Sequence, residues 1–232
     1  MATLAQEEGK SLVAQAMDAV KAYIREQAMH VGDTLPGEGY FAEQLGVSRA
    51  VMREAFGGLA ALKLIDVANG RRAKVGALDG SVIAASLDHA LSTDQIKVAD
   101  IWDVRRTIEM RTAALAARNA TSQQAARIVA LAEAMGQDDQ PHGQTTEDDI
   151  DFHLAIAEAS GNALFNQIVM SFVPLMRVAV PQAWQTRRTA DEKTDILARH
   201  KRLAWAIANR DANEAELAMA AHFDEAIGAL LR

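Results

Sequence analysis

Residues 35–59 read LPGEGYFAEQLGVSRAVMREAFGGL, two short runs of helical apolar spacing on either side of a Gly-Val-Ser turn. Gly46 is a typical residue for the corner, and Ser48 is placed to cap the second helix. Two helices that cross at a tight glycine corner form a helix-turn-helix. The spacing therefore predicts helices over 39–45 and 49–62.

The segments on either side complete a larger unit. Residues 11–29 have helical apolar spacing. After the second short helix, LIDVANGRRAKV (64–75) changes to alternating apolar residues, with a two-residue hairpin signal at Asn69-Gly70. Three helices followed by a hairpin predict a winged helix.

Basic side chains gather where such a unit would meet DNA. Arg49 and Arg53 are four residues apart, so they share one face at the start of the second short helix. Arg71 and Arg72 lie beside the predicted hairpin tip. Arginine binds guanine or phosphate in a bidentate manner. The alternative is a helical packing module with exposed arginines, but the corner, the paired arginines and the basic wing together favour DNA binding.

This stretch resembles the N-terminal domain of GntR-type bacterial transcription regulators, over about residues 12–76. The resemblance implies operator contacts for Arg49, Arg53 and the wing tip. Our predicted DNA-binding residues are Ser48, Arg49, Arg53, Asn69, Gly70, Arg71 and Arg72. The chain departs from the family at Gly39, where an arginine is usual, and at Gly37, where a capping serine is usual. This departure concerns the operator sequence more than DNA binding itself.

Composition places the whole chain among ordinary globular proteins. It has 232 residues, 50% of them hydrophobic, and it is rich in alanine with only 4 prolines, which favours close-packed helices. The absence of cysteine excludes disulfides and thiolate metal sites. No apolar run approaches the roughly 20 residues of a membrane span, so we expect a cytoplasmic protein without a membrane partner.

Charge divides the chain into two parts. Residues 1–76 hold nine basic and nine acidic side chains, so residues 77–232 carry the whole net charge of −7. We predict a winged helix-turn-helix domain over 1–76 and an all-α helical bundle domain over 77–232, giving a mainly α protein. The predicted helices of the second part are 79–91, 95–119, 122–135, 145–160, 162–178, 190–209 and 211–231, with a break at the Pro-Gln pair 181–182.

The run DDIDFH at 148–153 contains three acids and a histidine. At about 100° per residue, Asp149 and His153 point toward the apolar side of the helix, one turn apart. The opposite, polar arc holds Asp148, Asp151, Ala155 and Glu158. We therefore expect Asp148 and Asp151 on the surface and Asp149 in the core.

Two further histidines lie on apolar stripes. His200 shares a stripe with Ile196, Leu203 and Ile207, and His222 shares one with Ala218 and Met219. Three inward histidines and one inward carboxylate suit a divalent transition metal, zinc first, with nickel and manganese as alternatives. The alternative is a set of hydrogen-bonded core histidines, but each would need its own buried polar partner.

A buried arginine is predicted in the helix over 95–119. Arg105 shares the inward stripe with Ile101 and Ile108, while Arg106 faces solvent. A buried guanidinium requires an anion. Either Glu109, four residues further on, or the carboxylate of a bound ligand would meet this need.

Residues 95–230 resemble the FCD-type helical effector domain of the FadR subfamily. The motifs are Arg105-Arg106-x-x-Glu109, the Asp149 to His153 spacing, and Ser160-Gly161-Asn162. Metal-binding members use the positions of Asp149, His153, His200 and His222 as ligands. Members that sense organic acids imply effector contacts for Arg105 and Asn162.

These features support three hypotheses. The first is a dimeric transcription regulator, a repressor of metabolic genes, that binds a pseudo-palindromic operator and senses a small carboxylate at a metal site. The second is a metal-dependent enzyme with an accessory helix-turn-helix domain, although no further inward acid or histidine offers a general base. The third is a purely structural metal that ties helices together. We favour the first, which is not an enzyme.

Overall fold

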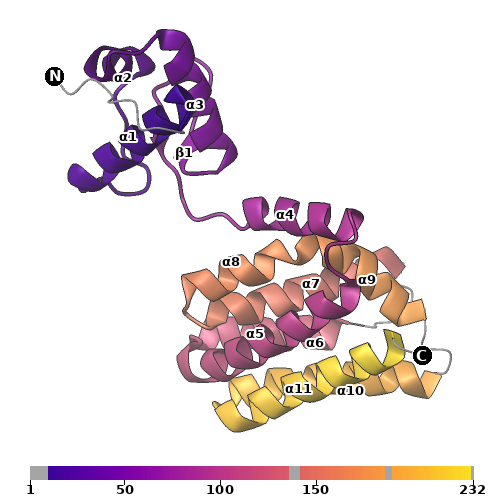
Figure 1. Ribbon diagram of the computed structural model, residues 1–232. Coiled ribbons are helices and arrows are strands. Elements are labelled where there is room, and N and C mark those ends of the chain that lie inside the picture. Colours follow the sequence, from indigo (N-terminus) through magenta and orange to yellow (C-terminus); the bar gives the residue numbers. More distant parts are fainter. Residues whose placement is uncertain (1–9, 136–141, 186–189, 231–232) are drawn as a thin grey trace. The chain divides into compact units, whose positions relative to one another are not determined.

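The computed structural model describes residues 10–135, 142–185 and 190–230. The chain divides into two compact units, residues 1–82 and 83–232 (Figure 1). The boundary after residue 76 that we drew from the charge split remains a prediction.

The first unit is the predicted winged helix. It contains α1 (Leu12–Glu26), α2 (Glu38–Leu45), α3 (Arg49–Ala61), β1 (Ile65–Asp66) and β2 (Lys74–Val75). Ser48 caps α3 by accepting a hydrogen bond from the Val51 amide, and Gly46 ends α2 in the left-handed region at a φ of 66°. Both α1 and α2 pack on α3 around a core that includes Leu35, Met52 and Leu59. The glycine corner and the serine cap thus form as the sequence predicted.

The wing differs from the predicted two-residue hairpin. Its strands pair only Ile65 with Val75 and Asp66 with Lys74, so the connecting loop spans 67–73. The loop contains a turn in which the Arg71 amide donates to the Ala68 carbonyl, with Gly70 at a φ of 73°. The two favoured turns of a two-residue hairpin, types I′ and II′, both need positive φ at the first central residue, and Asn69 does not adopt it.

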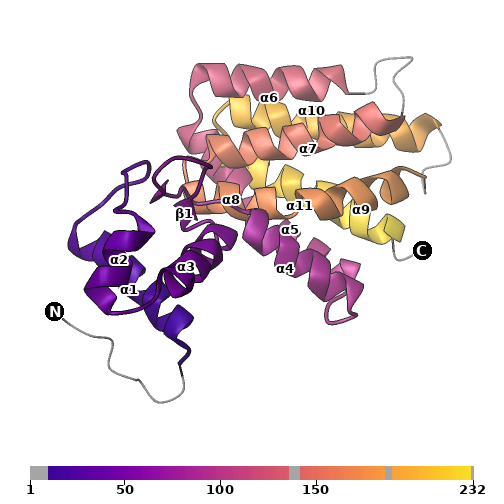
Figure 2. The same cartoon turned by 90° about the horizontal axis from the view of Figure 1, so that it is seen from above.

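The second unit is all helical in the residues that the structure describes. Its helices are α4 (Ser81–Ser92, which begins just before the unit boundary), α5 (Val98–Asn119), α6 (Ser122–Ala134), α7 (His142–Ala159), α8 (Ala163–Ser171), α9 (Val173–Gln185), α10 (Ala190–Ala208) and α11 (Ala212–Leu230). Helix α5 packs against α11 and α7, while α10 packs against α6 and α11 (Figure 2). Buried alanines on α5, among them Ala113, Ala116 and Ala117, allow close helix packing.

The predicted helix 162–178 is wrong as a single element. It is two helices, α8 and α9, which meet at Phe172 with a bend of 50°. Pro174 explains the break, because it has no amide hydrogen to continue the helix and restricts the preceding residue. The predicted stop at 181–182 is also wrong, since α9 continues through Pro181 to Gln185. The remaining helices of this unit agree with prediction to within three residues at each end.

No single helix in the described part of the chain has the length and apolar composition to cross a bilayer. Among the described residues, one bent pair, Ala163–Ser171 of α8 with Val173–Pro181 of α9, passes such a test. This is weak evidence for a span, since core helices of soluble proteins pass it as well.

Gly76, directly after β2, has no room for a side chain. A Cβ there would lie 2.4 Å from the Lys63 carbonyl oxygen and 3.1 Å from the carbonyl carbon of Leu64. We predict that Gly76→Ala lowers the free energy of unfolding by about 1–3 kcal/mol because backbone must move, as measured by urea unfolding. The control is Gly57→Ala on the exposed side of α3, where nothing lies within 4 Å. It should be neutral or stabilising by up to about 1 kcal/mol. Wild-type stability of Gly76→Ala would contradict the prediction.

Candidate functional site

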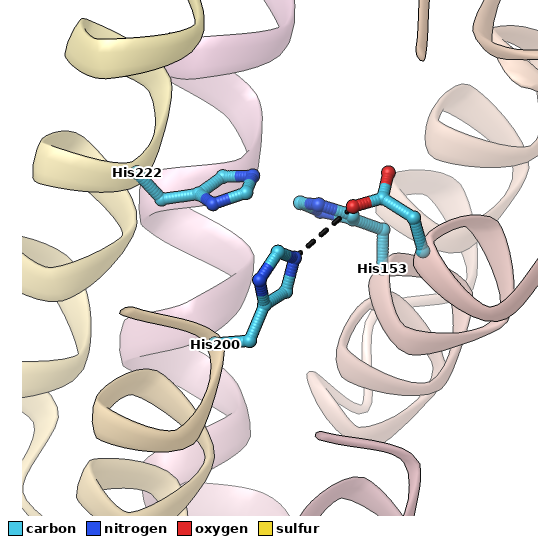
Figure 3. A group of neighbouring side chains, drawn as sticks. His153, His200 and His222 are labelled. Carbon is cyan, nitrogen blue, oxygen red and sulfur yellow. Dashed lines mark hydrogen bonds and ion pairs between the residues drawn. The ribbon is translucent and has the colours of Figure 1, made fainter. Parts of the chain in front are cut away.

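Four buried polar side chains from three helices meet inside the second unit. Asp149 and His153 come from α7, His200 from α10 and His222 from α11. One ligand atom from each lies within 4.8 Å of the others (Figure 3). The sequence thus identified a group that the fold does bring together.

Two contacts orient part of the group. His200 Nδ1 lies 2.9 Å from the Ile196 carbonyl oxygen. A carbonyl oxygen can only accept, so Nδ1 carries the proton and donates it. The other nitrogen, Nε2, lies 3.0 Å from Asp149 Oδ1. The Ile196 carbonyl therefore directs the potential ligand atom of His200 at the carboxylate.

Two imidazole nitrogens in the group lack a hydrogen-bond partner. His153 Nε2 and His222 Nδ1 are both buried, and no acceptor or donor within the described residues reaches them. Such orphaned groups are costly unless something binds them. Hydrogen-bonded core histidines would show partners here, so this observation favours a bound ion over that alternative.

The donor set also fits a transition metal by size. Two atoms that bind one zinc ion, at about 2.0–2.2 Å each, lie no more than about 4.4 Å apart. The observed spread of up to 4.8 Å needs only a small side-chain adjustment. Asp149, His153, His200 and His222 are therefore the residues that would hold the ion, which would supply a Lewis-acidic position for an anion.

The protonation states suit metal binding as well. Burial would raise the pKa of Asp149, but the hydrogen bond with His200 and the charges of the three histidines hold the pKa well below its usual range. Burial lowers the pKa of His222 well below its usual value, and His200 and His153 lower it further. The low pKa of Asp149 favours the ionised carboxylate, and the low pKa of His222 favours its neutral imidazole, and these are the forms that bind metal.

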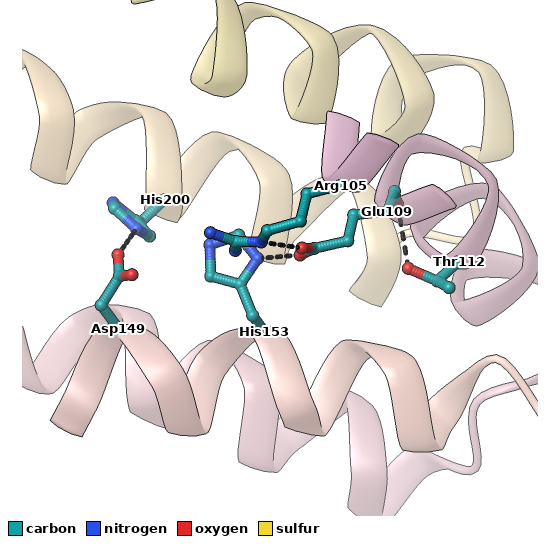
Figure 4. Close-up of polar contacts among 6 residues, drawn as sticks. All are labelled: Arg105, Glu109, Thr112, Asp149, His153 and His200. Atoms are coloured by element: carbon teal, nitrogen blue, oxygen red, sulfur yellow. Dashed lines mark hydrogen bonds and ion pairs between the residues drawn. The ribbon is translucent and has the colours of Figure 1, made fainter. Parts of the chain in front are cut away.

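A buried carboxylate stands behind His153. Glu109 Oε1 accepts a hydrogen bond of 2.8 Å from Arg105 Nε, and Glu109 Oε2 contacts His153 Nδ1 (Figure 4). Burial would raise the pKa of Glu109, but the positive charges of Arg105 and His153 lower it. Carboxylates that hold the second nitrogen of a ligand histidine fix its tautomer and raise its basicity.

The role of Glu109 toward His153 was missed by the sequence analysis. We considered Glu109 only as the partner of Arg105, and the structure confirms that ion pair, with both side chains at most 3% exposed. The sequence did contain one indication of this role. Glu109 follows Arg105 by four residues, so both side chains lie on the same inward face of α5. The adjacent Arg106 pairs at the surface with Asp224.

The solvent-exposed face of α7 contains fewer residues than predicted. Asp148 is half-buried and Ala155 is buried, so the prediction that both lie on the surface arc is wrong. Asp151 and Glu158 are exposed, as predicted. The reason is that α7 packs against helices on several sides, α5, α6, α8 and α9.

Asn162 does not join the group through any contact in the described residues. Its side chain is exposed and caps α8 by accepting hydrogen bonds from the amides of Leu164 and Phe165. It lies beyond the end of α7 at Ala159, the helix that carries Asp149 and His153. The effector contact that the resemblance implies for Asn162 remains a prediction.

The predicted DNA-binding residues all lie exposed on α3, its N-cap and the wing. They are Ser48, Arg49, Arg53, Asn69, Gly70, Arg71 and Arg72. The Arg49 guanidinium lies over Gly39, where an added Cβ would be 3.7 Å from Nη2. Arg53 makes a long contact of 3.8 Å with Glu38 and is 79% exposed. Their guanidinium groups therefore remain accessible to a partner.

Comparison with known proteins gives two matches that together cover most of the chain. Residues 12–75 match the model for bacterial regulatory proteins of the gntR family, and residues 100–225 match the FCD domain. The chain belongs to the GntR family and carries an FCD domain.

Several curated relatives are similar to this GntR protein over most of their length. The putative L-lactate dehydrogenase operon regulatory protein of Escherichia coli K12 is 31% identical, over 88% of this chain and 81% of its own. The regulator LutR of Bacillus subtilis is 28% identical, over 86% and 92%. The galactonate operon transcriptional repressor of E. coli K12 is 29% identical, over 81% and 82%.

A solved structure agrees with the fold. The Streptococcus agalactiae GntR structure matches with a TM-score of 0.67 and 25% identity, covering 93% of this chain and 99% of that one. The GntR family and these relatives are DNA-binding transcription regulators and not enzymes, so the metalloenzyme hypothesis is not favoured.

Asp149 and Asp151 provide a matched pair of tests on one helix. We predict that Asp149→Ala lowers Zn²⁺ affinity on the order of a hundredfold or more, because a charged ligand atom is lost. Asp151→Ala, which removes an exposed carboxylate, should keep wild-type affinity. Competition titration with a chromophoric chelator measures both, and circular dichroism checks folding. Equal affinities of the two variants would contradict the metal assignment.

Glu109 tests the support behind His153. We predict that Glu109→Gln lowers Zn²⁺ affinity by about 10–100-fold, because His153 loses a charged partner. The melting temperature should fall as well, since Arg105 keeps a buried charge without its counter-charge. Glu158→Gln is the control, because Glu158 pairs with Arg127 at the surface. A Glu109→Gln protein with unchanged metal affinity would show that Glu109 only neutralises Arg105.

Proposed function

We propose that this GntR protein is a metal-containing repressor of metabolic genes that responds to a small carboxylate. The observation that carries the proposal is the buried group of Asp149, His153, His200 and His222, with two unpartnered nitrogens. Arg105 is a buried cation, and Glu109 connects it to this group by contacting both Arg105 and His153. A metal and a guanidinium inside one domain are suited to an anionic ligand.

The DNA-binding part of the proposal rests on the first unit. We assign residues 1–76 to DNA binding and residues 77–232 to metal binding, effector binding and dimerisation. Arg49 and Arg53, exposed at the start of α3, would contact bases and phosphates, and Arg71 and Arg72 on the wing would contact the backbone. A homodimer would present two such units to a pseudo-palindromic operator.

For the metal we propose zinc, with nickel or manganese as alternatives. Three imidazoles and one carboxylate are a common donor set for such ions. Matches to the FCD domain support this assignment, since FCD domains commonly bind metal. We also propose that the chain belongs to the metal-binding members of the FadR subfamily, because it has all four ligand residues, Asp149, His153, His200 and His222.

The names of two relatives support a carboxylate effector. One regulates a galactonate operon and another an L-lactate dehydrogenase operon. Here the effector would bind at the metal and Arg105, with Asn162 as a further contact implied by the resemblance. Its binding would bias the packing of the helices and so the separation of two DNA-binding units. We propose that the protein acts in the cytoplasm.

A structural metal is the second candidate, favoured by the origin of the ligands on three separate helices. Chelation distinguishes the two roles. If the ion only ties helices together, its removal lowers the melting temperature, and no carboxylate changes operator affinity in the metal-loaded protein. If it senses, carboxylates change operator affinity only when the metal is present.

Operator binding tests the whole proposal. We predict that the purified, metal-loaded protein shifts DNA from its own upstream region, and that Arg49→Ala weakens this binding by roughly 1–3 kcal/mol, or about 5- to 150-fold. Arg127→Ala is the control, because it removes the same charge from an exposed site on α6. Gel-shift titration at two salt concentrations measures both. No shift at low salt, or equal loss in the two variants, would contradict the proposal.

A further inference from the structure

Three of the four candidate metal ligands have a polar contact that orients their side chains. Asp149 contacts His200, and Glu109 contacts the ring of His153. His222 is different. Among the described residues, its buried Nδ1 has no hydrogen-bond partner, and the contacts of its ring are aromatic. The position of His222 therefore depends on the backbone of α11, the helix that carries it.

His222 lies beside a ligand of the neighbouring helix. Helices α10 and α11 follow each other in the chain and pack together, and the ring centroids of His200 and His222 are 4.6 Å apart (Figure 3). To share one zinc ion, each ring has to offer a nitrogen at about 2.0–2.1 Å from it. The placement of α11 along α10 decides whether both rings can do so.

Arg199 connects the two helices next to both histidines. It directly precedes His200, and its Nη1 donates a hydrogen bond of 3.3 Å to the carbonyl oxygen of Ala221, the residue before His222. Its Nη2 lies 3.5 Å from a carboxylate oxygen of Glu225, also on α11. A guanidinium holds its donors in one fixed plane, so these two contacts together restrain α11 against α10.

We propose that Arg199 is a positioning residue for the metal site, which holds His222 beside His200 through the backbone of α11. This inference rests on the proposed function, since it requires the metal. Arg199 would not touch the ion. A positive charge near a metal ion repels it, so a role through charge alone would weaken metal binding. Positioning predicts the opposite, that Arg199 strengthens metal binding.

A second ion pair joins the same two helices and provides a control. Arg202 on α10 lies 2.6 Å from Glu214 on α11. Glu214 precedes His222 by eight residues, which is about two turns of helix. If any bridge between α10 and α11 were sufficient, removal of Arg202 would have the same effect on the metal site as removal of Arg199.

Zn²⁺ titration of the full chain, first freed of metal, tests the inference. Arg199→Met removes the donors and the charge but keeps the apolar stem, and it should lower Zn²⁺ affinity about tenfold, as for other residues that orient metal ligands. Arg199→Lys keeps a charged donor and should recover most of the affinity, and Arg202→Met should keep wild-type affinity. Competition with a chromophoric chelator measures all of them. Unchanged or higher affinity of Arg199→Met, or an equal loss in Arg202→Met, would overturn the inference.

A double-mutant cycle with His222→Ala identifies the ligand through which Arg199 acts. In protein that lacks the His222 ring, Arg199→Met should cause no further loss of Zn²⁺ affinity, because no ring is left to position. A loss of full size in that background would overturn the inference. Circular dichroism checks folding. If Arg199→Met does not fold, Arg199→Gln gives the same test, since its amide ends two bonds closer to the backbone.

The wild-type protein separates this inference from the proposed function. If it binds Zn²⁺ and Arg199→Met binds the ion equally well, the inference is wrong and the metal site remains. If Arg199→Met loses affinity as expected but no carboxylate changes operator binding, the role of Arg199 holds and effector-responsive regulation is wrong. If the wild type binds none of Zn²⁺, Ni²⁺ and Mn²⁺, both fail.

Discussion

The interior of the FCD domain depends on the contacts that the buried carboxylate of Glu109 makes with two basic side chains. These are Arg105 on the same helix and His153 on α7. An isolated carboxylate in such a place would be costly, and so would an isolated guanidinium. Each group is therefore tolerated because of the others, which fixes the rotation of α5 against α7.

That fixed rotation explains how the ligand group can be so compact. His153 is held from behind by Glu109, and His200 by the Ile196 carbonyl, so both rings are oriented before any ion binds. Helices α5, α10 and α11 approach closely because alanines such as Ala117, Ala204 and Ala218 lie between them. The alanine-rich composition and the convergence of three distant histidines thus share one cause, close helix packing.

The sequence predicted those features that depend on one helix at a time. Helical periodicity separated Asp149 and His153 from Asp151, and turn chemistry located the corner at Gly46. Prediction from the sequence failed where the packing of a second helix decides the burial or the contacts of a residue. Asp148 and Ala155 are more buried than a single apolar face allows, because α7 has neighbours on several sides. The contact between Glu109 and His153 depends on how two helices are rotated, which no periodicity within either helix reports.

The chain uses arginine in two physically different ways, and burial separates them. Arg49 and Arg53 are exposed, so their attraction to an anion is screened by salt and gains strength mainly from the high charge density of DNA. Arg105 is buried between aromatic rings beside a carboxylate, where salt screens little and the gain comes from satisfying N–H donors with the right geometry. An exposed guanidinium suits a large polyanion, and a buried one suits a single small anion of matching shape. The difference in burial thus fits the two roles that we propose for arginine, DNA binding in the first unit and effector binding in the second.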